Sequence, residues 1–126
     1  MKSKVILTIK DNCQYKARWV ACGYTQIFGQ DYEDTFSPTA QFKSILILLH
    51  LIAIEDMEMY TVDIGNAFLE SDIDKPLYII PPTDLCNYLN ISNKPIKLKK
   101  ALYGIKQAGR LWNILITKIY LNYGFK

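Results

Sequence analysis

Residues 4–22 read KVILTIKDNCQYKARWVAC, two short runs rich in β-branched and aromatic residues on either side of a polar DNCQ segment. Because Asp-Asn is a good turn pair, the pattern predicts an antiparallel hairpin with strands Lys4–Lys10 and Tyr15–Cys22. In the second strand two cations, Lys16 and Arg18, alternate with less polar residues. Since side chains alternate between the faces of a strand, both cations are expected on one face of the hairpin.

Downstream of the hairpin, two helices are the strongest signals. A segment with two glycines and a proline, residues 23–38, is typical of a loop. Residues 41–55 are apolar on nearly every side, which predicts a helix buried on most of its faces. Residues 108–123 carry apolar side chains at i, i+4 spacing, which predicts an amphipathic helix that Gly124 ends.

Between these helices the sequence predicts short extended segments. Residues 58–63 alternate like a strand and end in an aspartate, and residues 64–70 pass through a Gly-Asn turn into one helical turn. Prolines bound a short strand at 77–80, which suits the edge of a sheet. A polar loop follows, and a further strand is predicted at 95–98. Strands and helices mixed without a βαβ rhythm predict an α+β domain.

Composition narrows the class of protein. A chain of 126 residues predicts one domain, and 50% hydrophobic with 21% charged residues excludes a disordered polypeptide. No apolar run reaches the roughly 18 residues that span a bilayer, and the N-terminus lacks a secretory signal, so we expect an intracellular chain with no membrane partner. The net charge of +3 permits a polyanionic partner without requiring one.

Cysteine and histidine usage argues against two kinds of site. Cys13, Cys22 and Cys86 are widely spaced, and His50 is the only histidine. A structural zinc site needs about four closely spaced ligands, so none is expected, and the cysteines are interpreted as reduced thiols. A serine or cysteine triad is equally poorly supported by a single histidine within an apolar run.

Two small groups of residues could form a functional site. Asp63 ends a predicted strand, where its carboxylate could hold Mg²⁺, and the N–H groups of the following turn could take a phosphate. The more ordinary interpretation is a turn former or a helix cap. Lys16 and Arg18 could grip phosphate oxygens, or they could simply form a solvated hairpin face.

A third candidate is a basic segment. Residues 97–110 contain five cations, no acidic residue, two glycines and Tyr103, which suits a nucleic-acid backbone or, equally, a basic loop before a helix. The acidic run 31–34 is better interpreted as a solvated loop than as a metal cluster.

Four motifs together resemble a known family. Residues 15–26, YKARWVACGYTQ, are similar to the KARLVAKGYTQ opening of Ty1/copia-type retrotransposon reverse transcriptases. The similarity continues through residues 31–40 (DYEDTFSPTA) and 62–69, whose VD and NAFL match. It ends with residues 98–108 (LKKALYGIKQA) followed by Arg110 and Trp112. The motifs stand in the order and spacing of the family.

The resemblance implies part of the fingers–palm region of an RNA-directed DNA polymerase. It implies a single partial domain, with residues 1–40 as a fingers-like hairpin and loop and residues 41–126 as an incomplete palm with some fingers elements. The implied activity is nucleotidyl transfer from a dNTP to a primer 3′-OH with two Mg²⁺ ions. The implied partners are an RNA or DNA template–primer and the dNTP.

The resemblance also implies residue roles. Asp63 matches the first catalytic aspartate, a ligand of both Mg²⁺ ions, which the carbonyl of Ile64 would join. The N–H groups of Gly65, Asn66 and Ala67 would face the triphosphate, and Phe68 resembles the steric gate that excludes a ribose 2′-OH. Lys16 and Arg18 match residues that contact the dNTP phosphates. Template contacts are implied for Lys99, Lys100, Tyr103, Gly104, Lys106, Gln107 and Arg110.

The chain departs from the family pattern at several positions. Cys22 and Gly65 stand where lysine is common, and Gly109 replaces a proline that would preset a turn. The YVDD hairpin, which carries the other two catalytic aspartates, is not among the 126 residues. Asp72 and Asp74 lie on a predicted loop without the strand–turn context that would let them substitute.

The missing aspartates lead to an expectation about activity. Two Mg²⁺ ions close together need several anionic ligands, and one carboxylate does not offset their repulsion. We therefore expect the chain alone to be inactive and to bind Mg²⁺ weakly or not at all. Because the two apolar helices would keep an uncovered face, we also expect marginal stability or aggregation. The alternatives are a residual nucleic-acid-binding module that uses residues 97–110, or a module that docks on a fuller polymerase chain.

Overall fold

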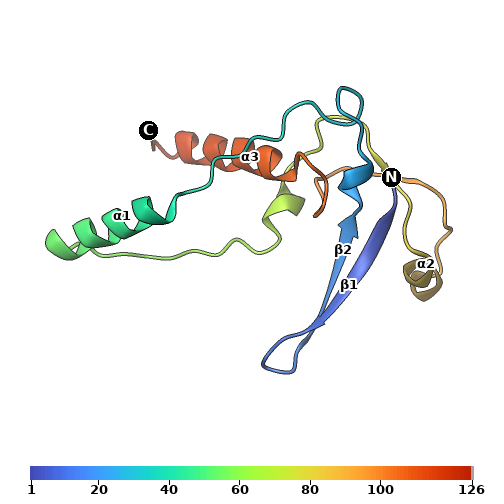
Figure 1. Ribbon diagram of the computed structural model, residues 1–126, viewed down its shortest axis with the longest axis horizontal. Helices are drawn as coiled ribbons and strands as arrows, with labels where there is room; N and C mark the ends of the chain where they lie inside the picture. Colours follow the sequence, from blue (N-terminus) through green and yellow to red (C-terminus); the bar gives the residue numbers. More distant parts are fainter. Residues whose placement is uncertain (126) are drawn as a thin grey trace.

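A computed structural model describes residues 1–125 of the chain. Four strands, three α-helices and two 3₁₀ turns follow one another within these residues (Figure 1). Two small antiparallel sheets together with the helices are compatible with the expected α+β class. In chain order the elements are β1 (Ser3–Ile9), β2 (Tyr15–Ala21), η1 (Gly23–Thr25), α1 (Phe42–Ile54), η2 (Ala67–Glu70), β3 (Tyr78–Ile79), α2 (Thr83–Leu89), β4 (Ile96–Lys97) and α3 (Ala108–Asn122).

The predicted hairpin is confirmed. Strands β1 and β2 pair antiparallel from Ser3 opposite Ala21 to Ile9 opposite Tyr15. At the tip of the turn Cys13 has a left-handed backbone, with φ of 60°. The base of the hairpin is tied to the rest of the chain, since the N-terminal ammonium of Met1 donates to the carbonyl of Tyr78 at 2.7 Å. The rest of the hairpin projects away from the body of the molecule (Figure 1).

The buried core lies where the base of the hairpin, strand β3 and the start of α3 meet. Ile79 and Ala101 are fully buried there, and Trp19 and Phe68 pack against the cluster from its margin. The buried hydrophobic members of this cluster are Ala21, Leu77, Ile79, Ala101, Leu102, Ile105, Ala108 and Leu111. Helix α3 is thus buried at its N-terminal end, which fits its predicted amphipathic pattern.

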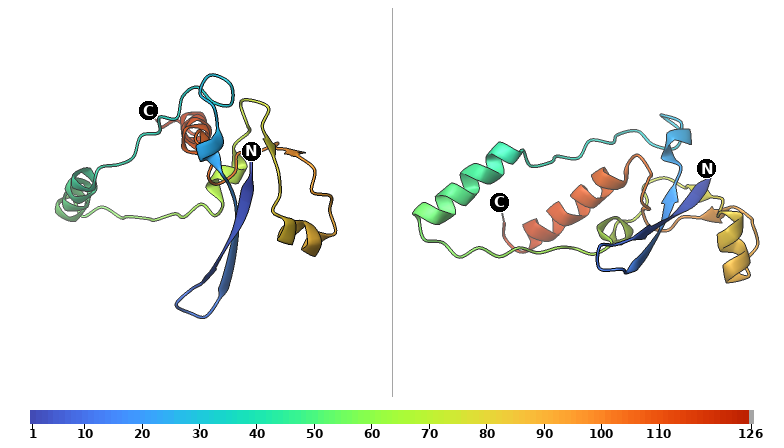
Figure 2. Two further views of the ribbon diagram at one scale, coloured as in Figure 1. Left: turned by 45° about the vertical axis from the view of Figure 1, so that its right-hand side comes forward. Right: turned by 60° about the horizontal axis from the view of Figure 1, so that its bottom comes forward.

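Helix α1 confirms one prediction and contradicts another. A helix forms within the predicted range, yet none of its residues is buried, and Ile47 is 62% exposed. The two further views show the helix standing apart from the hairpin, at the end of the molecule away from helix α2 (Figure 2). The expectation of burial was wrong. Apolar composition shows that a helix favours contact with another apolar surface, but residues 1–125 place no such surface against α1.

Two further predictions need correction. Residues 58–63 run extended but form no strand, because a strand needs a hydrogen-bonded neighbour and none pairs with them in the described part of the chain. The predicted polar loop after Pro82 contains helix α2. Its signal was a Thr-Asp start with Asp84 in the first turn, and a helix of only 7 residues is easily missed.

No helix within residues 1–125 is long and apolar enough to cross a bilayer.

Candidate functional site

One pocket collects residues that the sequence assigned to different roles. It has a volume of about 320 Å³ and is built from strand β2, the segment after residue 62 and the turn that precedes α3. Three parts of the chain that lie far apart in sequence therefore meet at one place. The lining residues are Lys16, Ala17, Arg18, Asp63, Ile64, Gly65, Asn66 and Tyr103.

Strand β2 supplies the positive charge of the pocket. Lys16 lies opposite Thr8 and Arg18 opposite Ile6 in the hairpin ladder, so the two cations are two residues apart and share a face, as predicted. Neither cation forms an ion pair within residues 1–125. Both charges are therefore free to bind an anion.

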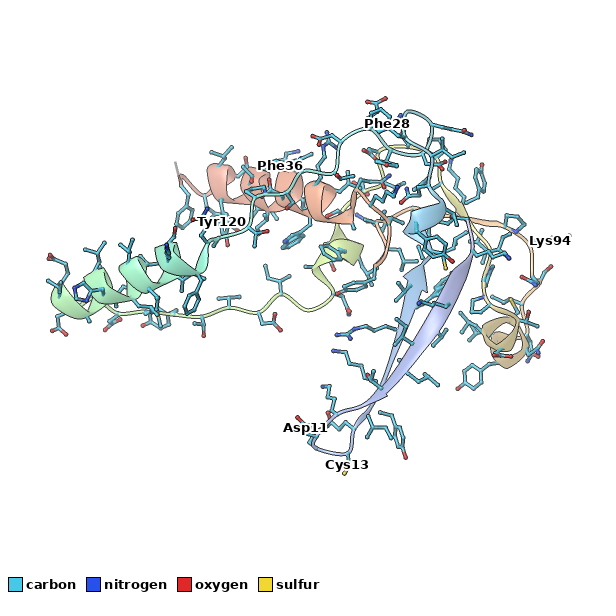
Figure 3. The ribbon with its side chains drawn as sticks, viewed as in Figure 1. Asp11, Cys13, Phe28, Phe36, Lys94 and Tyr120 are labelled. Carbon is cyan, nitrogen blue, oxygen red and sulfur yellow. The ribbon has the colours of Figure 1, made fainter. Side chains whose placement is uncertain are left out.

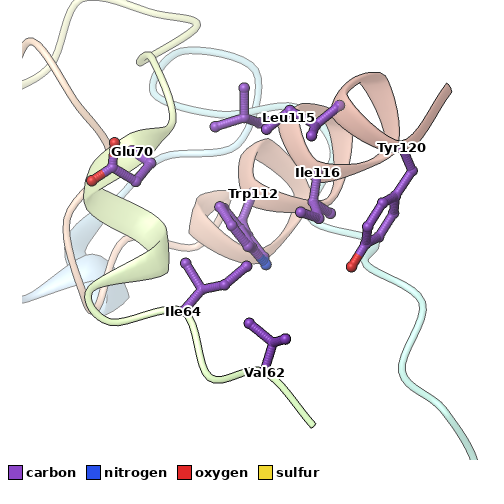
Figure 4. Close-up of a pocket in the computed structure, with 8 residues that line it drawn as sticks. Val62, Ile64, Glu70, Trp112, Leu115, Ile116 and Tyr120 are labelled. Carbon is purple, nitrogen blue, oxygen red and sulfur yellow. The ribbon is translucent and has the colours of Figure 1, made fainter. Parts of the chain in front are cut away.

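Asp63 supplies the negative charge. It is exposed, and its carboxylate forms no ion pair in the described part of the chain. The neighbouring side chains of Val62 and Ile64 point toward Trp112 of helix α3 and line an apolar pocket of about 600 Å³ (Figure 4). In an extended segment alternate side chains point to opposite sides, which leaves Asp63 free to face the cations of β2.

The turn after Asp63 exposes backbone donors. Asn66 has a left-handed backbone with φ of 56°, and its carbonyl accepts from the N–H of Leu69 at 2.8 Å, which begins η2. The N–H groups of Gly65 and Asn66 donate to no acceptor within residues 1–125. Apart from Gly65 and its two chain neighbours, no atom of residues 1–125 lies within 4 Å of the position that a Cβ on Gly65 would occupy. Free N–H groups with open space before them are suited to an anion.

Tyr103 lies in this pocket as well, although the sequence grouped it with template contacts. Its carbonyl accepts from the N–H of Ala21 at 2.8 Å. Its ring meets the ring of Phe68 edge-on, with the centroids 5.0 Å apart and the planes inclined at 61°. Phe68 itself is half-buried at the margin of the core. The two rings thus join the turn before α3 to the turn after Asp63.

The other cations predicted to contact the template are largely engaged inside the molecule. Lys100 pairs with Asp72 at 2.9 Å, and Arg110 pairs with Asp34 at 3.3 Å and with Asp74 at 3.4 Å. Lys106 donates to the hydroxyl of Tyr32 at 3.0 Å and lies over its ring. Gln107 is fully buried. Lys99 is exposed and forms no ion pair within residues 1–125, whereas Gly104 is held against the backbone of β2.

The acidic loop, residues 31–34, has an internal role that the sequence pattern does not indicate. Glu33 pairs with Lys75 at 2.8 Å, and the hydrogen bond from this ammonium lowers the pKa of the Glu33 carboxyl. The N–H of Phe36 donates to Asp34 and is the main cause of its lowered pKa, which the Arg110 guanidinium lowers further. The sequence shows complementary charges but not their pairing, in which Glu33 meets Lys75 and Asp34 meets Arg110.

Acidification should break the Glu33–Lys75 ion pair. Because the Lys75 ammonium lowers the pKa of the Glu33 carboxyl, the unpaired carboxyl binds more protons, so the pair is favoured above the ordinary carboxyl range near pH 4 and is lost as the pH falls through the lowered pKa. We expect the NMR signals of the Lys75 side chain to move toward unpaired values between about pH 5 and pH 3. The Glu33→Gln variant should show unpaired values at Lys75 throughout. Signals that stay constant in the native chain would contradict the assignment.

Residues 1–125 contain no group of three or more His, Cys, Asp or Glu side chains that could hold a metal ion. Among the described residues, Asp63 is the only carboxylate that lines the pocket. By themselves, these residues do not fit a site for two metal ions, and they offer at most one carboxylate to a hydrated ion.

Comparison with known proteins identifies the family. The sequence profile described as "Reverse transcriptase (RNA-dependent DNA polymerase)" matches residues 2–126. The chain belongs to the reverse transcriptase family. Proteins of this family generally use divalent metal ions and act on nucleic acids. No solved structure is significantly similar to this reverse transcriptase chain.

Curated relatives place the chain among reverse transcriptases of the Ty1/copia type. It is 38% identical over 112 residues to the retrovirus-related Pol polyprotein from transposon RE1 of Arabidopsis thaliana. It is 37% identical over 99 residues to the corresponding polyprotein from transposon TNT 1-94 of Nicotiana tabacum. These matches cover 89% and 79% of the chain but only 8% and 7% of the relatives, so the chain spans a small part of their length.

Proposed function

We propose that this chain forms the nucleotide-facing part of an RNA-directed DNA polymerase. The observation that carries the proposal is the shared pocket, in which Lys16 and Arg18 from β2 lie with Asp63 and the turn that follows it. Unpaired cations, free N–H groups and a carboxylate are the groups needed to bind a nucleoside triphosphate together with a divalent cation.

The proposed reaction is nucleotidyl transfer. The 3′-hydroxyl oxygen of a primer bonds to the α-phosphorus of a dNTP, the bond from that phosphorus to the bridging oxygen breaks, pyrophosphate leaves, and the hydroxyl proton passes to solvent. Catalysis of this step depends mainly on positioning and on the stabilisation of phosphoryl charge. The substrate, the activity and the template–primer partner are proposals for this chain.

Within this proposal each residue has a defined role. Asp63 and the carbonyl of Ile64 would hold one Mg²⁺ ion, which would supply charge neutralisation at the phosphates. The N–H groups of Gly65, Asn66 and Ala67 bind triphosphate oxygens, as do Lys16 and Arg18. The ring of Phe68 excludes a ribose 2′-OH. We assign residues 1–40 to a fingers-like hairpin and loop, and residues 41–126 to an incomplete palm with some fingers elements.

The template contacts proposed from the resemblance receive unequal support. Lys99 is exposed and unpaired within residues 1–125, whereas Lys100, Lys106 and Arg110 hold other parts of the chain. Tyr103 faces the nucleotide pocket. This internal pairing also weakens the alternative of a residual nucleic-acid-binding module, because phosphate contacts would have to displace existing partners.

The exposed apolar surfaces support a partnership with further polymerase residues. Helix α1 has no buried residue, and the apolar pocket between Val62 and helix α3 opens beside Asp63. Apolar surface of this extent is typically covered by protein. We therefore propose that the pocket acts within a larger polymerase assembly that supplies further carboxylates.

Primer extension tests whether the chain needs this larger assembly for the proposed reaction. On an RNA template with Mg²⁺ and dNTPs, the chain alone should extend a primer no faster than the no-enzyme control, because one carboxylate does not hold two metal ions. Asp63→Ala should leave this background unchanged. Extension above background that Asp63→Ala abolishes would mean that the chain completes its own site, and would overturn the proposed inactivity while supporting the proposed reaction.

A further inference from the structure

Two glutamines form a buried hydrogen-bonded pair behind the pocket. Gln26, which follows η1, is 5% exposed, and Gln107, which precedes helix α3, is 0% exposed. The Nε2 of Gln26 donates to the Oε1 of Gln107 at 2.9 Å, a contact between residues 81 positions apart in the sequence. A buried side-chain amide pair of this kind strongly favours one arrangement of the two segments that carry it.

The remaining groups of both amides are also engaged. The Oε1 of Gln26 accepts from the backbone N–H of Lys106 at 2.7 Å. The Nε2 of Gln107 donates to the carbonyl of Asp31 at 3.0 Å. Because removing one partner leaves buried donors and acceptors unsatisfied, the pair resists rearrangement.

The same two segments are in direct backbone contact. A Cβ on Gly23 would lie 2.0 Å from the carbonyl oxygen of Gly104, and a Cβ on Gly104 would lie 2.2 Å from the carbonyl oxygen of Ala21. Tyr103, one residue before this contact, has its carbonyl bound by the N–H of Ala21. The amide pair therefore fixes the turn at residues 103–106 against the end of β2.

This turn determines the position of an aromatic wall of the pocket. Tyr103 lines the pocket with Asp63 and packs edge-on against Phe68. We propose that the Gln26–Gln107 pair is a positioning element that sets the Tyr103 ring against Phe68, and so defines the wall against which a nucleotide sugar binds. The link to a nucleotide rests on the proposed function, whereas the control of Tyr103 by the two amides does not.

The first test uses ¹⁹F NMR of the full chain labelled with fluorotyrosine, without nucleotide, where the Tyr103 signal is the one absent from Tyr103→Phe. Gln26→Met removes both hydrogen bonds of the side chain with little change in size. It should displace and broaden the Tyr103 signal while the other tyrosine signals stay dispersed. Gln30→Met, a nearby exposed glutamine, is the matched control and should leave the Tyr103 signal in place.

A second variant separates positioning from general stability. Ionised Gln26→Glu still accepts from the N–H of Lys106 but has no donor for Gln107, whereas its protonated form can both donate and accept. Because the position is buried, the pKa of the introduced carboxyl should be raised above its ordinary value. The Tyr103 signal should therefore be displaced at about pH 8 and return toward its native position as the pH is lowered to about 5. The charged or titratable groups around this position are Asp31, Tyr32, Asp74, Lys106 and Arg110.

The possible outcomes distinguish a positioning role of the glutamine pair from a purely structural role. An unchanged Tyr103 signal in Gln26→Met would overturn the proposal. Collapse of all tyrosine signals in both Gln26 variants at both pH values would also overturn it, because the pair would then support only the fold. A titration with dTTP and Mg²⁺ is the separate arm: if the native Tyr103 signal does not respond while both variants behave as expected, the proposed nucleotide function fails and the positioning role stands.

Discussion

Gly104→Ala should destabilise the chain by about 4 kcal/mol, enough to remove most of the folded population of a marginally stable domain. Gly104 has a φ of +90°, a conformation that strains any residue with a side chain. The added methyl group would also lie 2.2 Å from the carbonyl oxygen of Ala21 and 2.6 Å from the Cγ1 of Val20. Backbone atoms cannot move aside cheaply, so the turn would separate from β2. Urea unfolding followed by circular dichroism measures the effect.

The matched control is Gly29→Ala. Gly29 also has a positive φ, of +81°, but apart from its own atoms and its two chain neighbours no atom in the described part of the chain lies within 4 Å of an added Cβ. Only backbone strain is introduced there, so the loss should be about 1 kcal/mol. Equal effects of the two substitutions would show that the close approach of Gly104 to β2 contributes nothing, and would contradict the contact that positions the pocket.

Asp63→Asn should reduce primer extension by about 10³-fold in a chimera in which residues 2–126 replace the matching segment of an active reverse transcriptase of this family. The substitution keeps the shape of the side chain but removes the charge that a divalent cation requires. Each tenfold change in rate corresponds to about 1.4 kcal/mol of transition-state stabilisation, so a 10³-fold loss corresponds to about 4 kcal/mol.

The control for this prediction is Asp11→Asn in the same chimera. Asp11 is exposed at the tip of the hairpin (Figure 3) and is not among the residues that line the pocket. Its removal should change the extension rate by less than about twofold, the range of ordinary surface substitutions. Full activity of the Asp63→Asn chimera would rule out a catalytic role for Asp63, and an inactive native chimera would show that this segment does not function in that context.

The elements predicted well from the sequence are those fixed by local chemistry. The hairpin follows from its Asp-Asn turn and two β-branched runs, and the turn after Asp63 follows from its Gly-Asn pair. Helix α3 follows from its apolar spacing, within one residue at its C-terminal end. Alternation along β2 placed Lys16 and Arg18 on one face, and both line the pocket with Asp63.

The failures concern partners that lie far away in the sequence. Burial of helix α1 and pairing of residues 58–63 both require neighbours, and residues 1–125 contain none in the right place. The engagement of Arg110 by Asp34 and Asp74 could not be predicted either, because composition shows which charges exist but not which ones meet. Likewise, no periodicity pairs Gln26 with Gln107 across 81 positions.

The isolation of helix α1 has a thermodynamic consequence. Its 13 residues are near the length at which a helix without packing is only marginally stable in water. Its first turn has no acidic residue and its last turn has no basic residue, so no charged side chain stabilises the helix dipole. No side chain caps its N-terminus. Its helicity is therefore linked to association: any surface that binds the apolar side chains also supplies the free energy that orders the backbone, so folding of this segment and its assembly form a single equilibrium.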